Sequence, residues 1–141
     1  MRLTITNVLL FAFINLSIFS VPSWAGDDDE EVSPQAVYFT FPEPFTINFL
    51  NQSKKKARYL QIKVSLMAHN PEIISSAELN LPMLEDSLRT LFSSQSFEEV
   101  TTIEGRKALQ NNALKTINSI LKEETGQDNL DAVYFTSFIL Q

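Results

Sequence analysis

Few residues of this chain have the types and spacing that chemistry at an active site requires. The single histidine, His69, has no second histidine and no cysteine with which to share a metal ion, because the chain contains no cysteine. We therefore expect His69 to be an ordinary residue at a strand end rather than a metal ligand or a catalytic base. The lack of cysteine also excludes a disulfide, a thiol nucleophile and a lipoprotein anchor.

Carboxylates are the other reactive groups available, and two of them can hydrolyse a glycosidic bond. The candidates Glu78, Glu85 and Asp86 show no sign of a shared cleft, so solvated helix faces explain them better. The acidic run Asp27–Glu31 offers oxygens to Ca²⁺, but it lacks the spacing and the glycine of an EF-hand loop. No nucleophile elbow, His-Glu-x-x-His, phosphate loop or Cys-x-x-Cys occurs. We expect no catalytic residue, no cofactor and no metal site, and a protein that is not an enzyme.

Two further clusters have a functional and an ordinary interpretation. Tyr134, Phe135 and Phe138 can line a ligand pocket, but aromatic side chains at this spacing more often pack in a core. The lysines Lys54–Lys56 can contact an acidic partner, but they are also typical of a solvated hairpin tip.

Residues 1–25 have the architecture of a secretory signal peptide. Arg2 is followed by the apolar stretch Val8–Phe19, and Ser23-Trp24-Ala25 is a small-x-small cleavage pattern. The alternative is an uncleaved membrane anchor, although six polar residues interrupt the segment and a spanning helix needs about 20 mostly apolar residues. Under either interpretation, Arg2 before the apolar stretch and five acids after it predict an exported body.

Cleavage after Ala25 leaves ten basic and seventeen acidic residues, a net charge of −7. This balance argues against nucleic acid and against an anionic lipid surface as main partners. Residues 26–36 read as an acidic disordered linker, because consecutive like charges repel one another and bury nothing. Residues 37–141 then form a single domain.

Alternating apolar residues predict an antiparallel hairpin. Val37–Phe41 is a short strand that ends at Pro42, and Phe45–Leu50 places Phe45, Ile47 and Phe49 on one face. Residues 51–56 form a polar turn, and Arg58–Asn70 is the longest strand. Its alternate residues Leu60, Ile62, Val64, Leu66 and Ala68 should face a core.

Two main helices follow. We expect Pro71–Leu81 to be a short helical turn or an irregular crossing, with Ile73, Ile74 and Leu79 packing inward. Pro82 opens a helix to Phe92 whose apolar stripe is Leu84, Leu88, Leu91 and Phe92. Ser93–Val100 should be a polar loop.

The second helix runs to about Glu124 and ends at Gly126. Thr101 and Glu104 fit a capping box at its start. Gly105 costs helix propensity, which suggests close packing against the preceding helix. The packing residues are Leu109, Ala113, Ile117, Ile120 and Leu121.

The final strand, Asp131–Gln141, is apolar on both faces, which predicts that it is interior to the sheet or covered on both sides. Ala36–Thr40 recurs identically as Ala132–Thr136. The two copies can be neighbouring strands, but chance in a biased composition is the favoured explanation.

In order and spacing, these landmarks resemble the periplasmic domain of the FliL family. They are Tyr59-Leu60-Gln61 in the hairpin, Pro82 before a leucine-striped helix, the Thr101-Thr102-x-Glu104-Gly105 helix start and the terminal Val133–Ile139 segment. The resemblance covers about residues 37–141. It implies a small α+β domain related to the stomatin (SPFH) fold, in which the antiparallel hairpin and the C-terminal strand pack against the two helices.

The resemblance also implies a role: a non-enzymatic accessory of the flagellar basal body, in the periplasm at the inner membrane. Its expected partners are stator and basal-body proteins and further copies of itself in a ring. Members of the family usually keep a full transmembrane helix, so cleavage after Ala25 would leave this chain without that tether. The alternative is a periplasmic binding or scaffold module unrelated to motility.

Overall fold

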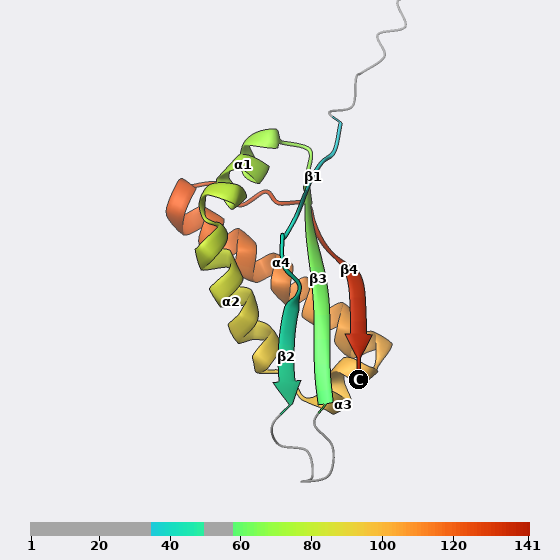
Figure 1. The fold of residues 1–141 in the computed structure, drawn as a ribbon. Helices are drawn as coiled ribbons and strands as arrows, with labels where there is room; N and C mark the ends of the chain where they lie inside the picture. Colours follow the sequence, from blue (N-terminus) through green and yellow to red (C-terminus); the bar gives the residue numbers. More distant parts are fainter. Residues whose placement is uncertain (1–34, 50–57) are drawn as a thin grey trace, which may run out of the picture. The chain divides into compact units, whose positions relative to one another are not determined.

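An antiparallel sheet with helices on one of its faces makes up the fold (Figure 1). The computed structural model describes residues 35–49 and 58–141. Its strands are β1 (Val37–Thr40), β2 (Phe45–Phe49), β3 (Arg58–Ala68) and β4 (Ala132–Leu140), and its helices are α1 (Pro71–Leu79), α2 (Leu81–Ser93), α3 (Phe97–Thr101) and α4 (Ile103–Thr125). The predicted signal peptide, most of the acidic linker and the lysine-containing turn lie outside the described residues. The α+β class with an antiparallel sheet is confirmed.

Strand β3 is the centre of the sheet. It pairs with β4 along residues 60–67, which occupies one of its edges. On the other edge, β1 pairs with residues 65–68 and β2 with residues 58–62. The sequence between β1 and β2 contains Pro42 and Pro44, and each proline lacks the N–H that a continuous ladder would need. One edge of β3 is therefore shared by two short strands rather than one long one.

The core lies between the sheet and the helices. All five of the β3 side chains predicted to face inward are fully buried, and so are Leu84, Leu88 and Phe92 of α2. Leu109, Ala113, Ile117 and Leu121 of α4 complete this layer. Because a strand repeats every two residues and a helix about every 3.6, each element presents one apolar surface to the core.

Two predictions about the helices were wrong. Leu79, expected to pack inward, is 84% exposed at the end of α1, because it lies two residues, or about half a helical turn, beyond the buried Ala77 and so on the opposite side of the helix. The expected loop Ser93–Val100 contains the start of α3. Ser96 caps α3 by accepting a hydrogen bond from the Glu99 amide at 3.2 Å, and the Glu99 carboxylate accepts one from the Ser96 amide at 3.0 Å.

The start of α4 differs from the prediction by one residue. Thr102, not Thr101, is the N-cap, and its hydroxyl accepts a hydrogen bond from the Gly105 amide at 2.9 Å. The capping box occurs instead one helix earlier, at Ser96 and Glu99. Gly126 ends α4 with a φ of 75°, in the left-handed region that favours glycine.

The prediction that the last strand is interior to the sheet or covered on both sides was wrong, because β4 is an outer strand with a bulge and one exposed face. Lys63 pairs with Ser137, but the next residue, Val64, pairs with Phe135, so Thr136 is an extra residue. The inward side chains are therefore Val133, Phe135, Phe138 and Leu140, all on one face. Tyr134, Ser137 and Ile139 point the other way, and β3 is the one strand that β4 pairs with among the described residues.

Candidate interaction surface

His69 has a structural partner rather than a catalytic one. Its ring Nδ1 lies 2.9 Å from Asp131 Oδ2, and its backbone amide donates to the same oxygen at 2.7 Å. The hydrogen bond from the ring, and then the one from the amide, lower the pKa of the Asp131 carboxyl. Both side chains are roughly half exposed. The pair therefore joins the end of β3 to the start of β4.

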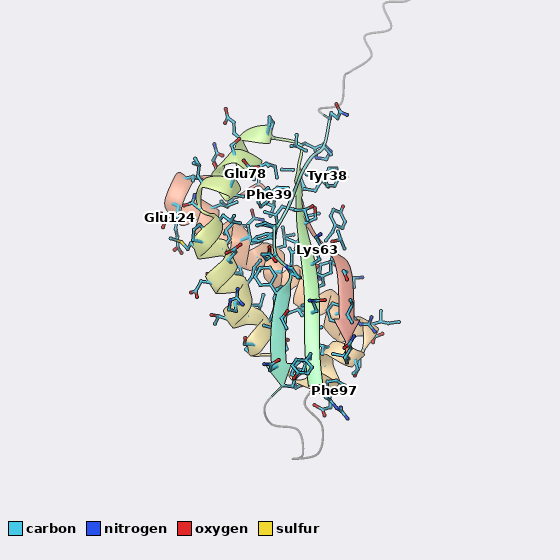
Figure 2. The ribbon with its side chains drawn as sticks, in the orientation of Figure 1. Tyr38, Phe39, Lys63, Glu78, Phe97 and Glu124 are labelled. Carbon is cyan, nitrogen blue, oxygen red and sulfur yellow. The ribbon has the colours of Figure 1, made fainter. Side chains whose placement is uncertain are left out.

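The carboxylate candidates do not converge. Glu78 lies near the end of α1, whereas Glu85 and Asp86 lie in α2. In the part of the chain that the structure describes, no group of three His, Cys, Asp or Glu side chains comes close enough to hold a metal ion. Figure 2 shows Glu78 with Glu124 at the helical side of the molecule, away from Tyr38 and Lys63 on the sheet.

The aromatic cluster of β4 is divided between the two faces of the sheet. Phe135 packs edge-on against Phe92 at a ring distance of 5.8 Å, and Phe138 lies under the Arg106 guanidinium at 5.3 Å. Tyr134 points to the other face and is 40% exposed. The two phenylalanines therefore pack toward the helices, in the ordinary manner, and the three rings do not line one pocket.

The face of the sheet opposite the helices, here called the open face, is the candidate interaction surface. Lys63 carries the single charge among its strand side chains, although the chain as a whole is acidic. Tyr38 is 59% exposed there, and Tyr59, Tyr134 and Ile139 are each between 40% and 44% exposed. The open face consists of Tyr38, Thr40, Thr46, Asn48, Tyr59, Gln61, Lys63, Ser65, Met67, Ala132, Tyr134, Ser137 and Ile139.

Tyr38 and Tyr134 form an aromatic pair at one end of the open face. They come from the two identical pentapeptides, whose strands β1 and β4 flank β3 from opposite edges, and their ring centroids are 6.5 Å apart. Between these strands, Ser65 is 5% exposed; its hydroxyl donates to the Phe39 carbonyl at 3.2 Å and accepts from Thr40 Oγ1 at 3.1 Å. The repeated segments are therefore neighbours of one common strand, not of each other.

Two side-chain amides of α4 hold β4 in place. The Asn118 amide donates to the Leu130 carbonyl at 3.2 Å and accepts from the Leu130 amide at 3.0 Å. Gln110 donates to the carbonyl oxygen of Val133 at 2.5 Å. These bonds fix the entry to β4, and with it the position of Tyr134 on the open face.

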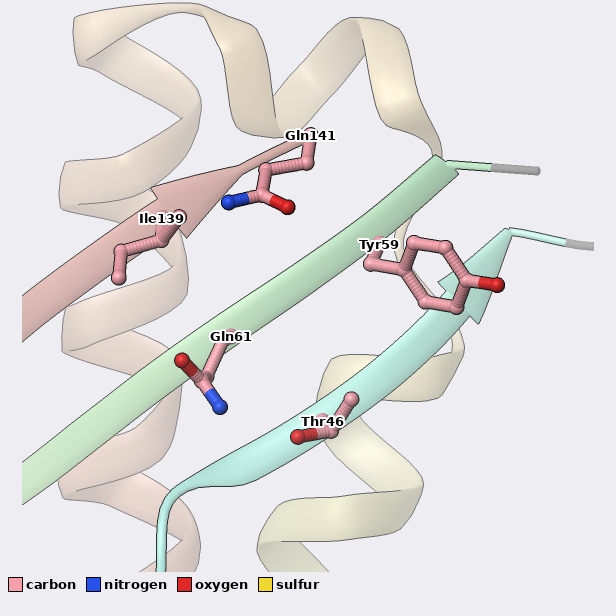
Figure 3. A pocket seen from close by; sticks show the side chains of 5 residues that line it. All are labelled: Thr46, Tyr59, Gln61, Ile139 and Gln141. Atoms are coloured by element: carbon pink, nitrogen blue, oxygen red, sulfur yellow. The ribbon is translucent and has the colours of Figure 1, made fainter. Parts of the chain in front are cut away.

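At the other end of the open face there is a shallow hollow of about 210 Å³ (Figure 3). Gln61 is paired with Thr46 on one side and with Ile139 on the other, and Tyr59 exchanges two backbone hydrogen bonds with Gln141. The sequence correctly placed Tyr59 and Gln61 on one face of their strand. It gave no signal for Ile139, which reaches this face because of the bulge at Thr136.

Comparison with known proteins identifies the family. Residues 38–141, from β1 to the last residue of the sequence, match the family described as flagellar basal body-associated protein FliL. The chain belongs to the FliL family. A flagellar protein FliL of Aquifex aeolicus is 29% identical over 105 residues, covering 74% of this chain and 62% of that protein. Flagellar protein LafL of Vibrio parahaemolyticus is 24% identical over 90 residues, covering 64% of this chain and 54% of that protein.

The FliL match confirms the resemblance found in the sequence, and it makes this chain a divergent member of a flagellar, basal-body-associated family. The match includes nearly all of β1 and all of β2, β3 and β4, so the whole open face lies within it. The chain spans less than two thirds of the length of these two FliL-type relatives. No helix among the described residues has the length and apolar content to cross a membrane.

Proposed function

We propose that this chain is a non-enzymatic accessory protein of the flagellar basal body that supports stator assembly and flagellar rotation. The observation that carries the proposal is the FliL match over residues 38–141. A binding role fits the chemistry of the open face, which offers aromatic rings, hydroxyls and one cation rather than a group of acids and bases.

The end of the open face around Tyr38, Tyr134 and Lys63 is the proposed contact with flagellar partners. Tyrosine combines a large apolar ring with a polar tip, and such residues are enriched at protein interfaces. Lys63 is exposed between the two tyrosines and the hollow, so it can pair with a carboxylate of the partner. The acidic side chains of α1, α2 and α4 lie outside this face and would repel a second acidic surface.

Export and self-association are further parts of the proposal. Residues 1–25 would direct the chain to the periplasm and residues 26–36 would serve as a spacer, so the domain would act at the inner membrane. Copies of the chain would associate, which multiplies weak contacts with a partner through avidity. The mass of the protein recovered from cells tests the first point, because cleavage after Ala25 leaves 116 residues. Crosslinking in intact cells tests the second.

The main experiment is complementation of a strain that lacks the gene, with swimming speed measured in viscous medium. The wild-type chain should restore swimming, whereas the double variant Tyr38→Ser with Tyr134→Ser should not. Glu124→Ser is the control, because this exposed residue lies at the far end of α4 (Figure 2). All three proteins should accumulate equally, since the altered side chains are exposed.

Crosslinking of the same strains separates the possible outcomes. Capture of stator or basal-body proteins by the wild type, lost in the double variant, is the expected result. If deletion of the gene leaves swimming unchanged in viscous medium, and the chain captures unrelated periplasmic proteins, the flagellar role is wrong. If swimming depends on the gene but the double variant restores it, the role stands and the assigned surface is wrong.

A further inference from the structure

The hollow on the open face has the composition of a binding site for an uncharged ligand. Its lining consists of Thr46, Tyr59, Gln61, Ile139 and Gln141, which supply one aromatic ring, one aliphatic group, two side-chain amides and two hydroxyls. None of these side chains carries a charge. Small-molecule sites combine apolar surface with a few placed polar groups in this way.

The polar side chains of the hollow are free to bind. No hydrogen bond within the described residues engages the side chains of Thr46, Tyr59, Gln61 or Gln141, although backbone bonds fix the strands that carry them. By contrast, the amides of Gln110 and Asn118 on α4 are used to hold β4. The hollow thus presents unused donors and acceptors on a rigid support.

The sheet geometry gives these groups a defined spacing. Neighbouring strands lie about 5 Å apart, and residues two apart on a strand lie about 7 Å apart on the same face. Thr46, Gln61 and Ile139 form one row across three strands, and Tyr59 with Gln141 forms the next row. Figure 3 shows all five side chains on the same side of the sheet. The platform matches a single six-membered ring in size.

We propose that this hollow is a subsite for one ring of a neutral saccharide. The Tyr59 ring and Ile139 would contact the apolar C–H surface of the sugar. Each glutamine amide has both donors and an acceptor, which suits hydroxyl groups that are themselves donors and acceptors. An anionic sugar is disfavoured, because neither a lysine nor an arginine lines the hollow.

An extended peptide fits this position less well. Peptides that add to a sheet bind along the free edge of an outer strand, whereas this hollow lies on the face of the sheet over β3, which is paired with β2 on one edge and with β4 on the other. A proline-rich peptide needs an aromatic-lined groove, whereas Tyr59 is the single aromatic residue that lines this hollow. This inference does not depend on the proposed flagellar function.

The test is a titration of the purified, ¹⁵N-labelled full-length chain, followed by amide chemical shifts. The probes are the trisaccharide of N-acetylglucosamine, cellotriose and maltotriose, with a proline-rich decapeptide for comparison. Any tag belongs at the N-terminal end, because Gln141 is the last residue and lines the hollow. We expect saturable shifts from at least one saccharide, confined to residues 46, 59, 61, 139 and 141 and their neighbours.

Matched tyrosine variants make the test specific. Tyr59→Ala should weaken saccharide binding at least about fivefold, because stacking on an aromatic ring is lost. Tyr134→Ala should bind as the wild type does, since this ring has nearly the same exposure but lies at the other end of the open face. Gln61→Ala should weaken binding about threefold to tenfold through the lost hydrogen bonds.

The proposal is overturned by any of three results. These are no shifts with any of the three saccharides up to their solubility limits, equal weakening by Tyr59→Ala and Tyr134→Ala, or saturable binding of the decapeptide alone. Spectra of the unbound variants should match the wild type outside the substituted site, so a loss of folding is distinguished from a loss of binding. Swimming assays play no part in this test, and failure of the flagellar role would leave it unaffected.

Discussion

Gly105, at the third position of α4, offers a test in which helix propensity and tertiary packing predict opposite signs. Alanine is a better helix former than glycine by about 1 kcal/mol, so propensity alone predicts that Gly105→Ala stabilises the protein. The structure predicts the reverse. A Cβ at this position would meet the carbonyl oxygen of Glu99 and would lie 2.8 Å from both the Glu99 carbonyl carbon and Thr102 Oγ1. Backbone atoms of α3 cannot rotate away as a side chain can.

The expected net effect of Gly105→Ala is a loss of about 2 kcal/mol in the free energy of unfolding. Overpacking of this kind costs about 1–3 kcal/mol. Displacement of Thr102 would also weaken its cap on the Gly105 amide, a bond of 2.9 Å that contributes about 1 kcal/mol. The propensity gain of about 1 kcal/mol offsets part of this loss.

Urea unfolding followed by circular dichroism measures the effect. The control is Ala108→Gly, an exposed position in the same helix, which should cost about 1 kcal/mol through propensity alone. A Gly105→Ala variant that is as stable as the wild type, or more stable, would refute the reasoning. It would mean that α3 can shift relative to α4 without losing contacts that matter.

Three further predictions concern Asn118, the leucines Leu79 and Leu88, and Asp131. Asn118→Ala should lower the free energy of unfolding, measured in urea, by about 1–3 kcal/mol, because the backbone N–H and C=O of Leu130 both lose a partner. Its control is Asn112→Ala at an exposed position of α4, which should change the free energy of unfolding by less than about 0.5 kcal/mol. Leu88→Ala, at a fully buried position, should lower the free energy of unfolding by about 2–5 kcal/mol. Leu79→Ala, at a position that is 84% exposed, should lower it by less than about 0.5 kcal/mol. Similar losses for both variants would contradict the placement of Leu79. The pKa of Asp131 is lowered from 3.8 by the His69 hydrogen bonds, so its stabilising effect is present above that pH and is lost as pH falls through the lowered value. Urea titrations at several pH values should therefore show Asp131→Asn less stable than the wild type, by under about 1 kcal/mol near neutral pH, with the difference shrinking below about pH 4.

Several elements were predictable from the sequence because their signals are local. The alternation from Leu60 to Ala68 identified the inward face of β3, and the leucine stripe from Leu84 to Phe92 identified the buried face of α2. Gly126 marked the end of α4 because the left-handed conformation there favours glycine. Gly105 indicated close packing, although the partner is the short helix α3 rather than the longer α2.

The predictions that were wrong concern segments with competing local signals. Thr101 and Thr102 can each cap a helix, but Thr101 is the last residue of α3, so Thr102 is the N-cap of α4. Leu79 resembles a packing residue by type, but burial depends on where α1 meets the rest of the core. The polar sequence from Ser93 suggested a loop, although Ser96 and Glu99 there form the capping box that starts α3.

The sequence by itself determined the FliL family, the α+β class and the inward face of most elements, since each follows from short-range periodicity or an ordered set of motifs. The tertiary structure decided which side chains of β4 reach the open face. A shift of one residue reverses every side chain of a strand, so the bulge at Thr136 turned Ile139 outward toward Gln61 and Phe138 inward. That register is set by pairing between β3 and β4, which are about 70 residues apart in the sequence, and no local pattern specifies it.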